Sequence, residues 1–259
     1  MGSASRVALA HTKSALSAEP LGAEAGADLL SASAQIGQSL PLLTALAETP
    51  ADSAAKTQLV ERVFASASAG ARSVLTTAVS QAWSSHGELV AGIEELGLRA
   101  AANSYSNLAD ELLAAAAVVD SNHDLELTLG SKLGSAESKL GLVDALFGAK
   151  LSGPALAVVR HLVANPRGRK LSPALRDSAR IAADQGGSEL ATVTVAAPLS
   201  DAQQQRISDL LAASAGRPVR ITTVVDPTIV GGVRIQIGDD VIDGSVSSRL
   251  EDLRLQLAG

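Results

Sequence analysis

The feature that most constrains this chain is a series of short apolar stripes at helical spacing, which covers residues 3–183 and is broken by glycine and proline. Apolar residues recur one, three and four positions apart, as on the buried face of an amphipathic helix. Three such stripes are Leu59, Val60, Val63 and Phe64; Leu140, Val143, Leu146 and Phe147; and Leu156, Val159, Leu162 and Val163. Breaks fall near residues 20–22, 49–50, 70, 130, 153–154 and 165–166. Short helices between short connections predict a helical bundle.

The core of this bundle has to be built from small residues. Hydrophobic residues make up 46% of the chain but aromatic residues only 2%, so Ala, Leu and Val must supply the buried surface. Such residues suit closely packed helices. The longest uncharged run, residues 29–47, contains many Ser, Gln and Thr side chains, so we expect no membrane span there. The N-terminus does not have the pattern of a signal peptide, and we expect a cytosolic chain.

Two helical stretches resemble each other at a shift of 83 residues. The shift places Lys56 on Lys139, Leu59 on Leu142, Val60 on Val143 and Phe64 on Phe147. A small-residue break follows each stretch. Any two amphipathic helices look somewhat alike, but this agreement in register favours an internal duplication.

The sequence changes character after Gln185-Gly186-Gly187. Residues 190–195 alternate as a strand does, and residues 198–214 predict a helix capped by Ser200, with Gln203 in place for a capping box. Ile207, Leu210 and Leu211 are its expected buried stripe. Strands are expected over residues 217–226, 231–238 and 241–243. A last helix is expected, with Val246, Leu250, Leu253 and Leu257 on one face.

The predicted fold class is therefore mainly α with a smaller α+β part: an N-terminal multi-helix bundle followed by a small C-terminal α+β domain. We predict three regions. Residues 1–105 are the first repeat, residues 106–185 are the second repeat and helical bundle, and residues 186–259 are the α+β domain.

The Gly-rich stretch from Val224 to Ser245 does not fit a known catalytic loop. No Lys follows Gly231-Gly232, as a phosphate-binding loop requires, and these glycines lead into a strand rather than a helix. The Asp spacing and the missing closing Glu exclude a standard calcium loop. We interpret the stretch as structural: Pro227 fixes a turn, Gly231-Gly232 allows a close backbone approach or a bulge, Gly238 turns the hairpin, and Gly244 precedes a helix capped by Ser245.

Other constellations also fail to predict chemistry. The chain has no cysteine, and its four histidines, at positions 11, 86, 123 and 161, are scattered, so each is expected to be exposed or capping. No nucleophile–base pattern occurs, which disfavours a hydrolase. The basic cluster at residues 165–170 could bind phosphate, but we interpret it as a solvated loop in which Arg169 and Lys170 are peripheral. The net charge of −6 argues against nucleic acid. We expect no catalytic, cofactor or metal site.

The C-terminal sequence resembles the δ subunit of F-type ATP synthases, the oligomycin-sensitivity conferral protein family. The pattern positions are Val219, Ile221, Val225, Asp226, Ile229, Gly231, Gly232, Val233, Ile235 and Gly238, followed by Asp239, Ile242, Asp243, Gly244, Ser245, Arg249 and Leu250. Residues 135–171 resemble the middle of the family's helical domain. The match covers roughly residues 101–259, and the length resembles the long form found in high-GC Gram-positive bacteria.

The resemblance implies a peripheral-stalk subunit that is not an enzyme and has no cofactor. It implies binding of the helical domain to the N-terminal helices of α subunits and of the C-terminal domain to the end of the b subunits. It also implies a peripheral membrane protein at the cytoplasmic face of the plasma membrane, which meets the membrane only through b and binds no nucleic acid. A typical family member lacks most of the first repeat. The α-binding surface could therefore lie in the first repeat, in the second repeat, or in both.

Overall fold

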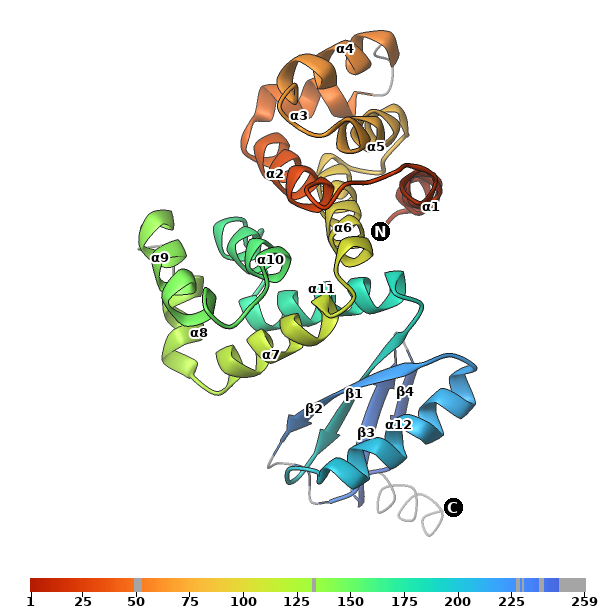
Figure 1. Cartoon of the computed structure of the whole chain (residues 1–259), viewed down its shortest axis with the longest axis vertical. Coiled ribbons are helices and arrows are strands. Elements are labelled where there is room, and N and C mark those ends of the chain that lie inside the picture. The colour runs from red at the N-terminus through yellow and green to blue at the C-terminus, as the bar shows by residue number, and fades with distance from the viewer. Residues whose placement is uncertain (49–52, 132–133, 227–228, 230, 238–239, 247–259) are drawn as a thin grey trace, which may run out of the picture. The chain divides into compact units, whose positions relative to one another are not determined.

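The computed structural model describes the chain except for residues 49–52, 132–133, 227–228, 230, 238–239 and 247–259 (Figure 1). The chain forms two compact units, Met1–Ala182 and Ala183–Gly259, which we call the helical unit and the C-terminal unit. Helices form the first unit and a small α+β arrangement forms the second. The predicted fold class is therefore confirmed, while the division of the helical part at residue 105 stays a prediction.

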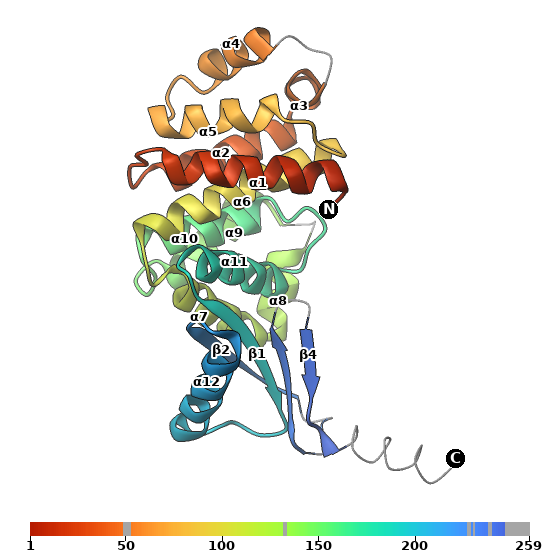
Figure 2. The ribbon, with the colours of Figure 1, turned by 90° about the vertical axis from the view of Figure 1, so that its right-hand side faces the viewer.

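The helical unit begins with six helices, and some of their ends fall at the predicted Gly and Pro breaks. They are α1 (Ser3–Ala18), α2 (Ala25–Gln38), α3 (Leu40–Ala47), α4 (Ser53–Val63), α5 (Ala69–Ser80) and α6 (His86–Ser104). Side chains cap some of their first turns: the Ser39 hydroxyl accepts from the Leu42 N–H, and Ser85 caps α6 in the same way. Figure 2 shows α1, α2, α5 and α6 lying side by side.

Five more helices follow in the same order. They are α7 (Leu108–Asp120), α8 (His123–Gly130), α9 (Ala136–Phe147), α10 (Gly153–Ala164) and α11 (Leu171–Gln185). Helices α6, α7, α8 and α9 each begin 83 residues after α1, α2, α3 and α4, respectively, and α10 and α11 begin 84 and 85 residues after α5 and α6. Equivalent helices also pack together, since α5 contacts α2 and α4 just as α10 contacts α7 and α9. The internal repeat is confirmed.

The residues that revealed the repeat occupy matching places in the two cores. Val60 and Val143 are fully buried, and Phe64 and Phe147 are nearly so. Lys56 is also buried, and its ammonium donates to the Val79 carbonyl (3.1 Å) at the end of α5. The shared pattern therefore marks the same inward face of α4 and α9.

Helix α6 is buried on almost every side. It packs against α1, α2, α3 and α5, and Glu94 on its remaining side meets α10 and the loop that follows α10. By its sequence position, α6 is both the sixth helix of one series and the first helix of the next. Helices of the first series supply most of this burial, and the second series meets α6 through α7 and through His161 of α10.

The C-terminal unit is a four-stranded sheet with a helix on one face (Figure 1). Its elements are β1 (Glu189–Val195), α12 (Asp201–Ala215), β2 (Val219–Val225), β3 (Val233–Ile237) and β4 (Asp240–Asp243). The strand order is β2-β1-β3-β4, with β1 parallel to β2 and antiparallel to β3. Ala191, Val193, Val195 and Ile235 form the buried face together with Leu211 of α12.

The predicted start of α12 is confirmed, and one of its predicted core residues is wrong. Ser200 and Gln203 form a complete capping box. Leu211 is buried and Ile207 packs on the core, but the Leu210 residue is 71% exposed. Only a narrow stripe of a single helix can touch the sheet, so one of two adjacent leucines points to solvent. Val246, at the start of the predicted final helix, is 41% exposed, and the rest of that helix lies outside the described residues.

Candidate functional site

The motif of the C-terminal unit begins with two glycines that require unusual backbone angles. Gly231 has φ 154° and Gly232 has φ 86°, a region that favours glycine. A Cβ atom on Gly232 would lie 2.4 Å from the carbonyl oxygen of Gly244 and 2.9 Å from Cα of Ser245. The close backbone approach that the sequence predicted at this position is confirmed.

Backbone hydrogen bonds tie the two ends of the hairpin together at this contact. The Gly244 N–H donates to the Val233 carbonyl (2.9 Å), and the Val246 N–H donates to the Gly231 carbonyl (3.0 Å). The entering and leaving chains therefore run side by side, and a side chain at position 232 would force them apart.

Asp243 ends β4 and orders the chain that leaves it. The Ser245 N–H donates to Oδ1 of Asp243 (2.9 Å). The hydrogen bonds from the hydroxyl and the N–H of Ser245, with the positive charge of Arg234, hold the pKa of Asp243 below its usual value. Arg234 stands opposite Asp243 in the register of β3 and β4. The carboxylate is thus kept charged between a turn and a cation.

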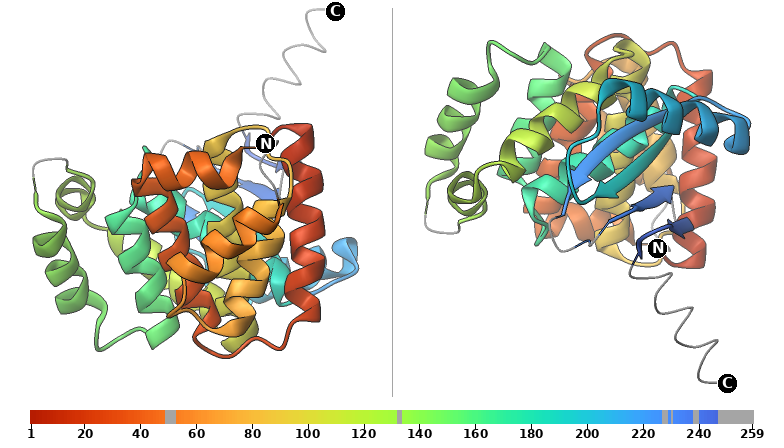
Figure 3. Two further views of the ribbon diagram at one scale, coloured as in Figure 1. Left: turned by 90° about the horizontal axis from the view of Figure 1, so that it is seen from above. Right: turned by 90° about the horizontal axis from the view of Figure 1, so that it is seen from below.

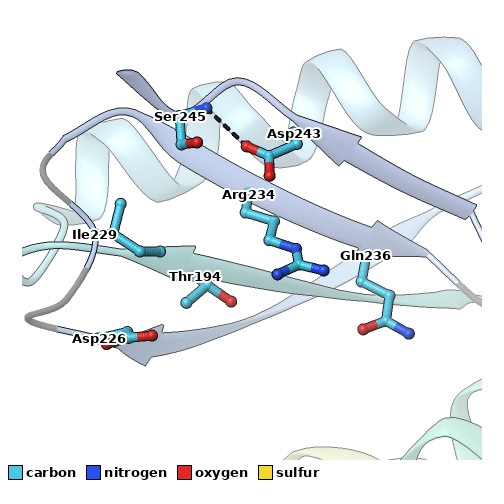
Figure 4. Close-up of a pocket in the computed structure, with 7 residues that line it drawn as sticks. All are labelled: Thr194, Asp226, Ile229, Arg234, Gln236, Asp243 and Ser245. Carbon is cyan, nitrogen blue, oxygen red and sulfur yellow. Dashed lines mark hydrogen bonds between the residues drawn. The ribbon is translucent and has the colours of Figure 1, made fainter. Parts of the chain in front are cut away.

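These groups line a polar pocket of about 470 Å³ on the sheet (Figure 4). Strand register places Thr194, Arg234 and Asp243 in one row across β1, β3 and β4, on the face opposite the core residues. Asp226 closes one end, where its N–H donates to the Val195 carbonyl (2.9 Å). The lining residues are Thr194, Asp226, Ile229, Arg234, Gln236, Asp243 and Ser245.

The structure brings together most of the predicted motif. Asp226, Gly231, Gly232, Asp243, Gly244 and Ser245 lie around the hairpin base and its pocket, whereas Pro227, Gly238 and Arg249 lie outside the described residues. The functional role of all nine stays a prediction. Sequence reasoning missed Thr194, Arg234 and Gln236 as pocket residues. These three residues occupy the polar positions of the alternating strand pattern. The sequence prediction used that pattern only to identify the buried positions.

The chemistry of this pocket is that of recognition. A guanidinium, two carboxylates, hydroxyls and an amide can form hydrogen bonds and ion pairs with a polar partner surface. Among the residues that the structure describes, no three His, Asp or Glu side chains gather in a way that could hold a metal ion.

The helical unit contains a second polar cluster, around Glu94, that corrects two predictions. His161, expected to be exposed or capping, is buried and lies 3.0 Å from Oε2 of Glu94. The basic loop, expected to be solvated, sends Arg167 (2.6 Å) and Arg169 (2.8 Å) to Oε1 of the same carboxylate. Sequence periodicity can identify a position that faces the core. It cannot identify the ion-pair partner of Arg167, because that carboxylate lies 73 residues away in the sequence.

Burial alone would raise the pKa of Glu94. Hydrogen bonds from His161 and Arg169, together with the charges of Arg167 and Arg169, outweigh that effect and lower the pKa of Glu94 to about 2. Its side chain is only 5% exposed. A carboxylate in such a place is stable only while its cationic partners remain.

Within the described ranges of the chain, no helix combines the length and the apolar character that crossing a membrane requires.

Comparison with known proteins agrees with the fold and the motif. Residues 96–257 match the family described as ATP synthase delta (OSCP) subunit. The ATP synthase subunit delta of Leifsonia xyli subsp. xyli is 45% identical and aligns over 100% of both chains. That of Streptomyces coelicolor is 34% identical over 100% of this chain and 98% of its own, and that of Nocardia farcinica is 32% identical over 100% of both.

The family match begins within α6, so it includes the second helical series and the C-terminal unit. The alignments with the full-length relatives also include the first series. The chain belongs to the ATP synthase delta (OSCP) subunit family.

Proposed function

We propose that this chain is a non-catalytic peripheral-stalk subunit that links the α subunits of the catalytic head to the membrane-anchored b subunits of an F-type ATP synthase. In this role it keeps the head from turning with the rotor, so that rotation stays coupled to proton flow and ATP synthesis. It acts at the cytoplasmic face of the plasma membrane, which it meets through b. Family membership supports this proposal, together with two compact units that offer different surfaces.

The observation that carries the α-binding part is an exposed stripe on α1. Val7, His11, Ser14 and Ala18 are all exposed, and Val7 is 69% exposed although it is apolar. Figure 2 shows α1 nearest the viewer, with no other helix of the helical unit in front of it. This stripe combines the small side chains of Ser14 and Ala18 with an exposed valine and His11, and another helix can pack on such a surface.

The repeat itself shows how a helix docks on this stripe. The residues 83 positions later on α6 are Val90, Glu94, Gly97 and Ala101, and all four are buried. Helix α2 contributes to this cover, with Gly37 near Val90, Leu30 near Gly97 and Gly26 near Ala101. Residue numbers fall along α2 as they rise along α6, so the two helices are antiparallel. We propose that an α-subunit N-terminal helix covers α1 in the same manner.

Calorimetric titration of the full chain with a peptide of the α-subunit N-terminus tests this. Val7→Asp should weaken binding at least tenfold, since it replaces the large exposed apolar side chain of the stripe with a charge. Leu127→Asp on α8 is the matched control, because Leu127 is an exposed apolar residue of the second repeat. Both variants should keep the unfolding temperature of the native chain. Loss of binding with Leu127→Asp alone would assign the site to the second repeat.

The polar pocket of the C-terminal unit supports the b-binding part. Gly232→Val should disrupt the hairpin, because the new side chain would overlap the Gly244 carbonyl, and should release b while α binding persists. Gly216→Ala is the matched control, since Gly216 also has a positive φ (68°) but a Cβ there would contact nothing. Pull-downs with the soluble part of b and with the α peptide give both readouts. Retention of b by Gly232→Val would disprove this assignment.

Two rival functions are less well supported. A nucleic-acid module would use the basic loop, but Arg167 and Arg169 are already paired with Glu94. A hydrolase would need a nucleophile next to a base, and the pocket of the C-terminal unit has Ser245 and Thr194 but no histidine among its lining residues.

A further inference from the structure

The helical unit contains an ion-pair cluster between parts of the chain that are far apart in sequence. Glu94 lies on α6, His161 on α10, and Arg167 and Arg169 on the loop between α10 and α11. Arg169 forms a fork with both carboxylate oxygens, at 2.8 Å from Oε1 and 3.2 Å from Oε2. Bidentate pairs of this kind fix direction as well as distance.

A tight turn in this loop places Arg167 and Arg169 next to Glu94. The Arg169 N–H donates to the Pro166 carbonyl (2.9 Å), which closes a tight turn with Arg167 and Gly168 at its centre. Arg167 has φ 46° and is the non-glycine residue with a positive φ in the described part of the chain. An arginine in the left-handed region is strained, and surrounding contacts must hold it there. Its bond to Glu94 (2.6 Å) is such a contact.

A neighbouring bond joins the same loop to α2. The Gln38 amide donates to Oδ1 of Asn165 (2.9 Å), and the Asn165 amide donates to the His161 carbonyl (3.1 Å). The first repeat is thus attached to the end of α10 at two places, α2 and α6, both through polar groups.

Part of the remaining seam between the repeats is lined mainly by small side chains. Ala23, Ala27, Ala101, Pro154 and Ala157, together with Leu30, surround a pocket of about 420 Å³ between α2, α6 and α10. Apolar contact area is reduced at this pocket. Directed polar interactions therefore add to the apolar packing in setting the orientation at this seam.

We infer that Glu94, His161, Arg167 and Arg169 form a clasp that fixes the second helical repeat against the first. The carboxylate of α6 is the common acceptor, and removal of any one donor leaves the others attached. Removal of the acceptor breaks all of these contacts at once and leaves the Gln38–Asn165 hydrogen bond. This inference does not depend on the identity of the binding partners.

The absence of cysteine allows a direct test on the full chain by spin labels at two introduced cysteines. Gln58→Cys on α4 and Ser138→Cys on α9 are exposed positions in the first and second repeats. Pulsed electron resonance then measures their separation. The parent pair should give one narrow distance distribution, and Glu94→Gln should broaden it and add a second population while the helical circular dichroism stays unchanged.

The matched control is Arg160→Gln, which removes the exposed pair between Arg160 on α10 and Asp144 on α9 (2.8 Å). It should leave the distribution narrow. Arg169→Gln is the milder variant if Glu94→Gln loses helicity. The distance distribution of the double variant Glu94→Gln with Arg169→Gln should be no broader than that of Glu94→Gln alone. The reason is that both substitutions disrupt the same pair, Glu94 and Arg169. A distribution that stays narrow in Glu94→Gln, or one that Arg160→Gln broadens equally, would overturn the clasp.

Discussion

The two helical series share helix order and spacing, but they differ in what covers their first helix. On α6, the stripe formed by Val90, Glu94, Gly97 and Ala101 is buried, and the Val90 residue is 6% exposed. On α1, the residues of the equivalent stripe are exposed, and Figure 3 shows α1 at an edge of the helical unit. In a tandem arrangement, the same helix face becomes core or surface according to whether a neighbour precedes it. The open end is where a partner can continue the packing.

The largest expected effect is at Glu94. Replacement of Glu94 by Ala leaves Arg167 and Arg169 without their common carboxylate, which should lower the free energy of unfolding by about 3–5 kcal/mol. The equivalent position on α1 is His11, which is exposed, and His11→Ala should change it by less than about 0.5 kcal/mol. Urea unfolding measures both. Similar losses at the two positions would mean that the stripes are not as different as the structure indicates.

Low pH should remove the contribution of Glu94 to the stability of the folded chain. The pKa of Glu94 is lowered to about 2 in the folded chain, so its contribution to stability is present above the ordinary pKa near 4.5 and is lost as the pH falls toward 2. Its size at neutral pH is roughly 3 kcal/mol. The groups that face it are His161, Arg167 and Arg169. The stability of Glu94→Gln, followed by urea unfolding from pH 6 to pH 3, should fall less steeply than that of the native chain.

A smaller effect is expected where α2 crosses α6. A Cβ on Gly26 would lie 2.7 Å from the backbone nitrogen of Ala101, which cannot move aside. Gly26→Ala should therefore cost about 2 kcal/mol by overpacking. The second series has Ala109 at this position, so the change makes the first series resemble the second. Ala109→Gly should cost only about 1 kcal/mol, through helix propensity. Stabilisation by Gly26→Ala in thermal unfolding would contradict the close approach.

The smallest expected effect is at the surface pair on α10. Arg160 and Asp144 lie 2.8 Å apart but are largely exposed, so Arg160→Gln should cost less than about 1 kcal/mol. Urea unfolding at low and high salt measures this. A loss as large as that at Glu94 would show that burial does not distinguish the two ion pairs.

Much of the fold could be predicted from the sequence because it rests on local patterns. The shift that aligned Phe64 with Phe147 also relates the starts of α1–α4 and α6–α9, and the capping box of Ser200 and Gln203 formed as predicted. The break near residue 185 coincides with the end of α11. Each of these depends on residues close together in the chain.

The candidate sites were less predictable because they depend on long-range pairing. A basic loop is ordinarily solvated, and only the packing of α10 beside α2 and α6 brings Arg169 to Glu94. The sign of a charge in the sequence does not identify its partner. In the C-terminal unit, Arg234 and Thr194 became pocket residues only after strand pairing placed them in one row.

Helix α6 has a consequence for how chains of this kind change length. Because it closes one series and opens the next, an added series requires five new helices rather than six, and its first surface already exists. Insertions or deletions of about 83 residues at this helix would keep the order of the helices on both sides. The length of the helical unit is therefore adjustable in whole series, each of which begins with a helix equivalent to α1.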